Sequence, residues 1–181
     1  WGSSWDSEGP LPLAPTEAFA ETLTLKRSTA HEMVAEECKS IREGVALLDI
    51  TGFSRFEVKG ENAEAWLDKI FATKLPKPGR ARLAVMLSPT GKLKGDLTLL
   101  NWGDGTFWIM GSYYLRAWHM RWFNDQIQDG VSVRDLGDDI CGFALIGPNS
   151  HVILQKVAEE DVSKMRFMDL SLIHISEPTR R

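Results

Sequence analysis

The sequence predicts an α+β domain with a largely antiparallel sheet and packed helices, and two observations support this class. Short segments with strand patterns are interspersed with segments of helical spacing. Tight turns containing glycine, at 89–91 and 103–105, join successive strand segments, whereas parallel strands need long crossovers. We expect the domain to span 28–170, after an irregular lead-in at 1–27 that carries three of the eight prolines.

The two ends of the chain indicate a truncated fragment. The first residue is Trp1 rather than Met, so the lead-in is interpreted as coming from a missing upstream domain. The last segment, 171–181, breaks with the pattern before it and is expected to be a non-native tail, which is kept out of fold reasoning. The alternative is a genuine strand followed by a tail.

Composition and charge narrow the class of protein. The chain has 181 residues, 43% of them hydrophobic and 25% charged, which is typical of one globular domain. A net charge of −4 argues against a nucleic-acid partner. Cys38 and Cys141 form no CxxC pair, which favours a reducing compartment: the cytoplasm, or the mitochondrial matrix in a eukaryote. No apolar run is long enough to cross a bilayer, so no membrane partner is expected.

Helix and strand signals alternate along the first half of the domain. Helices are expected from 28 or 29 to about 43, where Gly44 follows, and over 61–71. The apolar run 45–50 is typical of a buried strand. Residues 54–59 alternate between apolar and polar side chains, which predicts a strand with one buried face.

The second half predicts a meander of strands and two further helices. The expected strands are 83–87, 93–101, 106–111, 131–135 and 142–146, and the helices are 113–127 and 150–159. Trp66, Trp118 and Trp122 lie in predicted helices, and we expect them to pack those helices onto the sheet.

Asp96 is the most informative polar residue, because it lies inside a segment that otherwise favours a strand. Asp is depleted in strands, so its carboxylate is expected to be solvated, paired or part of a site. Gly91 and Gly95 precede it, and a glycine within a strand indicates a bulge or a close approach by backbone or ligand. The alternative is an Asp exposed on the outer face of a sheet, without a function.

The hairpin after Asp96 decides which side chains lie near it. If 103–105 is a three-residue loop with a bulge, Trp102 pairs with Thr106. That register places four side chains on one face in two opposing pairs: Thr98 with Met110, and Asp96 with Ser112. Such a patch suits a planar heterocycle. A two-residue loop would instead move Met110 and Ser112 to the other face.

Other candidate sites are weaker. His31 and His119 fall in predicted helices without a partner at metal-ligand spacing, so we expect surface or half-buried histidines and no metal site. The basic loop 74–82 could attract an anionic ligand, although a charged run is usually a solvated loop. No GxGxxG fingerprint occurs, so we expect no flavin- or nicotinamide-binding unit in this chain.

Four successive motifs resemble the aminomethyltransferase (glycine cleavage T-protein) superfamily, and most closely the folate domain of dimethylglycine and sarcosine dehydrogenases. They are REGVALLDITGFSRFEVKG (42–60), GENAEAWLDKI (60–70), PGRARLAVMLSPTGKLKGDLTLL (78–100) and FWIMGSYYLRAWHMRWF (107–123). Each motif is common, but their order and spacing are specific. The resemblance covers roughly 30–169 and implies the N-terminal part of a folate-binding aminomethyltransferase-like domain.

The resemblance also implies a tetrahydrofolate site. Asp96 matches the family carboxylate beside the pterin, which makes it the expected catalytic residue. The implied cofactor-binding residues are Phe53, Leu83, Asp96, Thr98, Met110 and Ser112. Glycine-cleavage enzymes usually have Tyr at the position of Leu83 and Asn at that of Ser112, so both departures favour the dehydrogenase branch.

The implied activity is capture of a one-carbon unit as 5,10-methylenetetrahydrofolate. An upstream flavin domain of the same parent chain, which alone would carry FAD, would oxidise a small N-methyl amine. Asp96 would then act as a general base or would orient the folate nitrogen. The alternatives are a stand-alone glycine-cleavage-type aminomethyltransferase and a non-catalytic folate-binding module.

Overall fold

The computed structural model describes residues 2–4, 7–9, 22 and 24–171, and the chain divides into two compact units. One unit comprises 1–48 and 145–154, and the other comprises 49–144 and 155–181. Most of the expected lead-in, and the expected tail beyond Ser171, lie outside the described residues. Among the described residues, no helix is long and apolar enough to cross a bilayer.

The first unit contains a pair of short strands, helix α1 and the beginning of helix α4. Strands β1 (Gly2–Ser4) and β2 (Ser7–Gly9) pair antiparallel, which the sequence pattern does not indicate. Helix α1 (His31–Glu43) confirms the helix expected to end near 43, and the N–H of Gly44 donates to the carbonyl of Ser40. Helix α4 (Ser150–Val157) begins after the turn that starts at Gly147.

Strands β3 (Ala46–Asp49) and β9 (Phe143–Ile146) form a two-stranded sheet of their own. The expectation of a buried strand here is wrong, because Leu47 is 66% and Leu48 53% exposed. Two strands leave side chains exposed on both faces unless another layer packs against them. An apolar run therefore predicts the strand but not what covers it.

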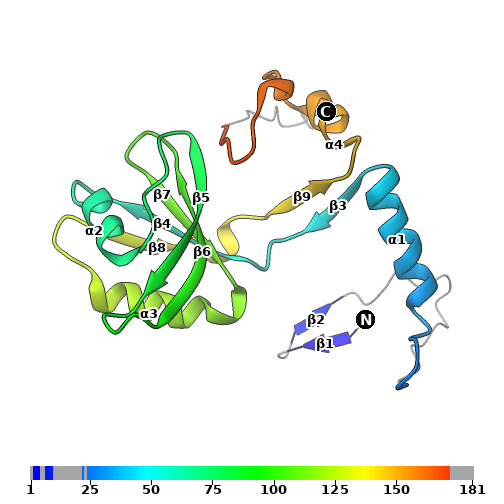
Figure 1. The fold of residues 1–181 in the computed structure, drawn as a ribbon, viewed down its shortest axis with the longest axis horizontal. Helices are drawn as coiled ribbons and strands as arrows, with labels where there is room; N and C mark the ends of the chain where they lie inside the picture. The colour runs from blue at the N-terminus through cyan, green and yellow to red at the C-terminus, as the bar shows by residue number, and fades with distance from the viewer. Residues whose placement is uncertain (1, 5–6, 10–21, 23, 172–181) are drawn as a thin grey trace, which may run out of the picture. The chain divides into compact units, whose positions relative to one another are not determined.

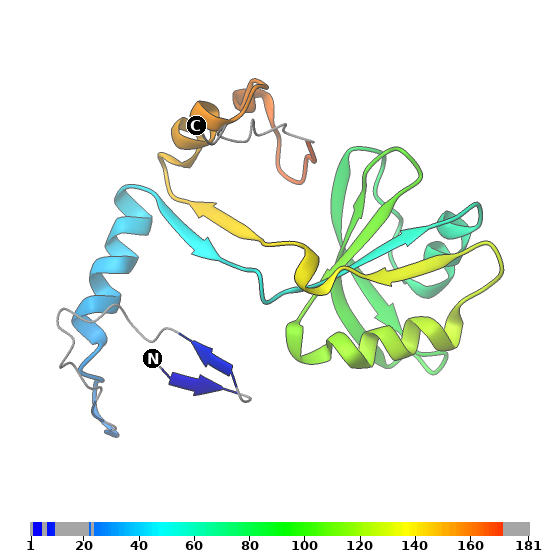
Figure 2. The same cartoon turned by 180° about the vertical axis from the view of Figure 1, so that it is seen from behind.

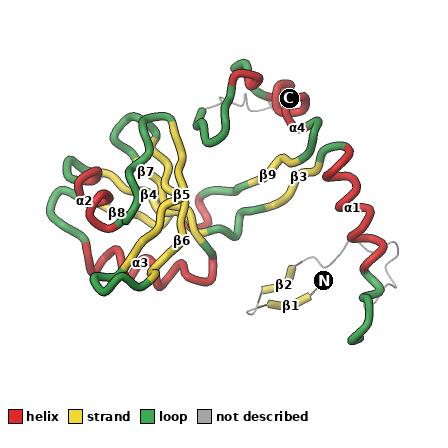
Figure 3. The backbone as a smooth tube through the Cα atoms, viewed as in Figure 1, coloured by secondary structure: helices red, strands yellow, loops and turns green. Residues whose placement is uncertain are grey.

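The second unit is built on an antiparallel sheet with the strand order β5-β6-β7-β4-β8. Its strands are β4 (Ser54–Lys59), β5 (Arg80–Leu87), β6 (Leu93–Asn101), β7 (Phe107–Gly111) and β8 (Ser132–Asp135). The helices are α2 (Ala63–Ile70) and α3 (Arg116–Gln126), with short 3-10 helices at Tyr113–Leu115, Gly137–Asp139 and Val162–Lys164. Figure 1 labels these elements, and Figure 3 distinguishes the strands, in yellow, from the helices, in red. The α+β prediction is confirmed.

Helices α2 and α3 cover one face of this sheet, and the core lies between the helices and the sheet (Figure 2). The ring of Phe123 packs edge-on against Phe56, with centroids 5.2 Å apart, and against Trp66 at 6.0 Å. The indole N–H of Trp66 donates to the carbonyl of Gln126 over 2.7 Å. Trp66 therefore ties α2 to the end of α3, as its helical position predicts.

Of the other two tryptophans, Trp122 packs against the core formed with the sheet, so the role expected of it is confirmed. Trp118 and Trp122 are half-buried and stack on each other, with centroids 6.4 Å apart. The Nζ of Lys94 lies 5.0 Å from one ring centroid and 4.8 Å from the other. Helix α3 also packs on the sheet through His119 and Phe123, which lie on its buried face.

Candidate functional site

The face of the sheet opposite the helices carries a continuous row of side chains from four strands. Leu83 of β5 lies opposite Thr98 of β6, Thr98 opposite Met110 of β7, and Met110 opposite Arg55 of β4. Leu83 is 61% exposed, whereas Thr98 and Met110 are half-buried. The row is a mixed apolar and polar strip that is open on the Leu83 side.

Asp96 lies on the same face, two residues before Thr98. The hairpin loop between β6 and β7 has the three residues 103–105, because the N–H of Trp102 donates to the carbonyl of Thr106 over 3.1 Å. The predicted register is therefore confirmed for Thr98 and Met110. The pairing of β6 with β7 begins at Thr98, so the predicted pair of Asp96 with Ser112, which directly follows β7 and is exposed, stays a prediction. Within the described residues, no hydrogen bond or ion pair engages the Asp96 carboxylate, so it is free to accept from a ligand.

Arg55 holds the loop that precedes β4. It is only 4% exposed, and its Nη1 donates to the carbonyls of Thr51 (3.0 Å) and Phe53 (2.9 Å). Its Nη2 donates to the carbonyl of Ile50 over 2.9 Å. These three bonds fix the backbone that presents Phe53, whose ring is about half exposed.

A hollow of about 360 Å³ lies between that loop and the segment after β7. Its lining residues are Asp49, Ile50, Gly52, Phe53, Ser112, Tyr113 and Tyr114. Phe53 and Ser112 therefore lie together here, while Leu83, Asp96, Thr98 and Met110 lie on the adjoining sheet face. A larger hollow of about 430 Å³, between α2 and the β6–β7 hairpin, contains none of the predicted site residues.

His119 lies on the opposite side of β6 and β7 from Asp96. It is fully buried, so the expectation of a surface or half-buried histidine is wrong. The imidazole occupies space left by two glycines: a Cβ added at Gly95 would lie 3.0 Å from Nε2, and one at Gly111 would lie 3.7 Å from Cε1. Burial lowers the pKa of His119, and an interaction with the Lys94 backbone opposes this shift only in part. Gly95 thus marks the close approach of a side chain rather than of a ligand.

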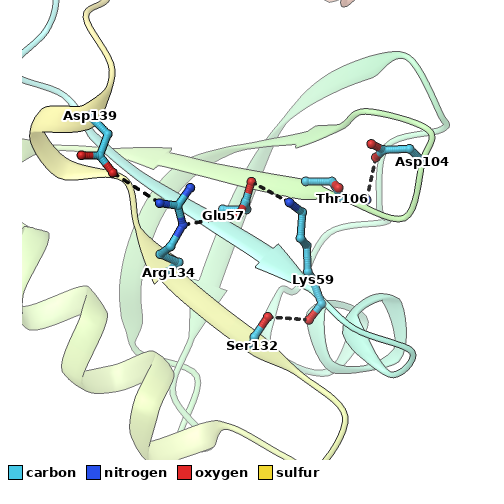
Figure 4. Close-up of polar contacts among 7 residues, drawn as sticks. All are labelled: Glu57, Lys59, Asp104, Thr106, Ser132, Arg134 and Asp139. Atoms are coloured by element: carbon cyan, nitrogen blue, oxygen red, sulfur yellow. Dashed lines mark hydrogen bonds and ion pairs between the residues drawn. The ribbon is translucent and has the colours of Figure 1, made fainter.

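The β4–β8 part of the outer face is charged. Glu57 of β4 lies between Lys59, whose Nζ is 3.1 Å away, and Arg134 of β8, whose Nε is 3.5 Å away (Figure 4). Arg134 also pairs with Asp139 over 3.3 Å. Because these groups satisfy one another, the β4–β8 part of the face offers less to a ligand than the part that carries Asp96.

Sequence reasoning missed Arg55 and Asp49. The alternation in 54–59 correctly places Arg55 on the face opposite Phe56 and Val58, but nothing in it indicates that Arg55 is buried. Asp49 is followed two residues later by Thr51, and its Oδ1 accepts from the N–H of Thr51 over 2.7 Å. An Asp-x-Thr pattern at the end of a strand is a signal for such a turn.

Comparison with solved structures assigns the fold. Glycine cleavage system aminomethyltransferase T from Bartonella henselae matches 75% of this chain and 38% of its own length, with a TM-score of 0.64 and 20% identity, which shows a shared fold. The model of the family GCVT N-terminal domain matches residues 12–179. The chain therefore belongs to the GCVT N-terminal domain family.

Two relatives indicate the branches of the family. Human mitochondrial dimethylglycine dehydrogenase is 27% identical over 158 residues, which cover 84% of this chain. The aminomethyltransferase of Anoxybacillus flavithermus is 26% identical over 136 residues, which cover 74% of this chain. The matches span only 18% and 37% of these relatives. The chain is thus an aminomethyltransferase-type domain whose relatives are longer enzymes.

Proposed function

We propose that this chain is the tetrahydrofolate-binding domain of an FAD-dependent N-demethylating dehydrogenase of the dimethylglycine or sarcosine type. The observation that carries the proposal is the open strip formed by Leu83, Thr98 and Met110, with the unpaired Asp96 carboxylate beside it. A mixed apolar and polar strip with a free carboxylate acceptor beside it suits a planar heterocycle that carries N–H donors.

The residues present fit this ligand. Leu83 and Met110 supply apolar contact area, Thr98 and Ser112 supply hydroxyls, and Phe53 supplies a ring beside the strip. Tetrahydrofolate, when bound, supplies the nitrogen nucleophile that captures a one-carbon unit as 5,10-methylenetetrahydrofolate. Asp96 accepts a hydrogen bond or a proton from that nitrogen and so holds it in the reactive orientation. FAD and the oxidation of the N-methyl amine belong to an upstream flavin domain of the parent protein, in the cytoplasm or the mitochondrial matrix.

Calorimetric titration of the chain with tetrahydrofolate tests the proposal. We expect saturable binding that is weakened in Asp96→Asn, with a change in unfolding free energy of no more than about 0.5 kcal/mol. Asp104→Asn is the matched control, because Asp104 is exposed on the β6–β7 hairpin loop, away from the strip. Absence of binding by the folded chain, or equal binding by both variants and the wild type, would overturn the folate site.

The second candidate is a glycine-cleavage-type aminomethyltransferase, which the relative from A. flavithermus favours. Its partner would be a lipoyl-bearing carrier protein. Assays of the gene's complete product separate the two: oxidation of dimethylglycine or sarcosine supports the dehydrogenase, and transfer from an aminomethylated carrier supports the aminomethyltransferase. If the complete product binds folate without catalysing either reaction, the domain is a non-catalytic folate-binding module.

A further inference from the structure

We propose that the neutral imidazole of His119 is a positioning residue for Asp96 and Ser112, and that protonation of this ring weakens folate binding. The effect on folate rests on the function proposed above. The positioning itself is argued from the burial of the ring, from the two glycines beside it and from its lack of a hydrogen-bond partner among the described residues.

Two glycines leave room for the ring, and each directly precedes a candidate site residue. A Cβ added at Gly95 would lie 3.0 Å from Nε2, and one added at Gly111 would lie 3.7 Å from Cε1, which is bonded to Nε2. Asp96 follows Gly95, and Ser112 follows Gly111. The backbone is extended at both places, so successive side chains point to opposite faces. The imidazole therefore lies behind the backbone that presents Asp96 and Ser112.

The ring is held in this position by close packing. It is fully buried, the ring of Phe123 stacks on it with centroids 6.2 Å apart, and the ring of Trp118 meets it edge-on at 5.3 Å. The buried hydroxyl of Ser54 donates to the carbonyl of Ser112 over 3.3 Å and so ties that residue to the same packed region. Because a close-packed interior leaves little free space, a shift of the ring displaces the strands beside it.

A protonated ring does not fit this environment. In the part of the chain that the structure describes, neither Nδ1 nor Nε2 has a hydrogen-bond partner, and both become donors in the imidazolium. Burial lowers the pKa of His119, and the backbone of Lys94 favours the charged form only in part. A buried charge without a partner is strongly unfavourable, so protonation favours a state in which the ring moves toward water.

The charged side chains on the elements packed around the ring do not supply a counter-ion. On β6, Lys94 is itself a cation whose Nζ lies over two tryptophan rings, and Asp96 points to the other face. Arg116 of α3 pairs with Asp135 of β8 over 2.7 Å. On β4, Arg55 donates to the carbonyls of the preceding loop, and β7 contains no titratable side chain. The neutral ring is therefore the form that this packing selects.

An NMR titration of the ligand-free chain tests the positioning. The Cε1–H signal of the ring gives the pH midpoint at which His119 titrates. We expect the amide signals of Asp96 and Ser112 to change with the same midpoint, and His119→Phe, which keeps a neutral ring, should remove that component. His151→Phe is the matched control, because His151 is exposed on α4, and it should leave the component unchanged.

Calorimetric titrations with tetrahydrofolate above and below that midpoint test the effect on binding. The Kd of the wild type should increase as the pH falls, by up to about tenfold per pH unit, because one proton competes with the ligand. The increase should be smaller in His119→Phe and unchanged in His151→Phe. A merely structural role of His119 would alter stability without changing this pH dependence.

Three results would each overturn the proposal: a ring that stays neutral until the chain unfolds, amides of Asp96 and Ser112 that do not follow the ring, and an equal pH dependence of binding in His119→Phe. If His119→Phe does not fold, the agreement of the three midpoints in the wild type decides. Amides that follow the ring in a chain that binds no folate at any pH remove only the folate function. Folate binding without the pH dependence removes only the role of His119.

Discussion

Where α3 packs on β6, the imidazole of His119 fills the space beside Gly95. A Cβ at position 95 would lie 3.0 Å from Nε2 of His119 and 3.1 Å from Cδ1 of Leu97. Real Cβ contacts are rarely so short, so the imidazole occupies space that only glycine leaves open. The next residue in the strand is Asp96, on the opposite face. The packing of His119 against Gly95 therefore also bears on the position of the Asp96 carboxylate.

Gly95→Ala should destabilise the chain by roughly 1–3 kcal/mol, because the new methyl group forces His119 and Leu97 apart. Gly52→Ala is the control, since a Cβ there meets nothing within 4 Å. Urea denaturation would measure both. Equal midpoints for the two variants would show that the core adjusts freely around position 95.

Stability should fall as the pH decreases below about 6.5. The pKa of buried His119 is lowered in the folded state, so the unfolded chain takes up a proton at a higher pH than the folded chain does. The stability from neutral His119 is present above the unfolded pKa and is lost as the pH falls toward the folded one. Urea midpoints between about pH 7.5 and pH 5.5 test this. His119→Phe should reduce the slope over this range, and an unchanged slope would contradict the assignment.

Trp66→Ala should cost roughly 3–5 kcal/mol, because it removes a buried ring and its hydrogen bond to Gln126. Trp118→Ala should cost less, since Trp118 is half-buried and stacks on Trp122 beside Lys94. Thermal unfolding of the two variants compares them. A larger loss for Trp118→Ala would mean that the stacked pair, rather than Trp66, holds the helices on the sheet.

Arg55→Met should destabilise the chain by about 2–4 kcal/mol, because three loop carbonyls lose their donors. Arg134→Met is the matched control on the same face. The Arg134 side chain is exposed and forms surface ion pairs, so its loss should cost no more than about 1 kcal/mol. Denaturant midpoints that do not differ would show that solvent replaces the Arg55 hydrogen bonds.

Much of the second unit could be predicted because its signals are local. Alternation and turn glycines place β6 at 93–101, and the length of the 103–105 loop decides that Thr98 and Met110 share a face. The exposure of Leu47 and the burial of His119 could not be predicted, because both depend on which elements distant in the chain pack against them.

The residues of the candidate site likewise differ in how far the sequence indicates them. Asp96 stands out in the sequence because a carboxylate is unusual in a strand, and the family resemblance adds Phe53 and Leu83. Arg55 gives no such signal, because its partners are backbone carbonyls, which every residue possesses. The hollow that contains Phe53 and Ser112 arises only when the loop before β4 and the segment after β7 come together in space.

The hydrogen bonds of Arg55 also determine how the neighbouring hollow should respond to a ligand. Because they fix the backbone from Ile50 to Phe53, the conformational entropy of that segment is lost during folding rather than upon ligand association. A ligand thus meets a preorganised receptor. Its affinity should depend on the contacts that it makes, with little penalty for rearranging the loop.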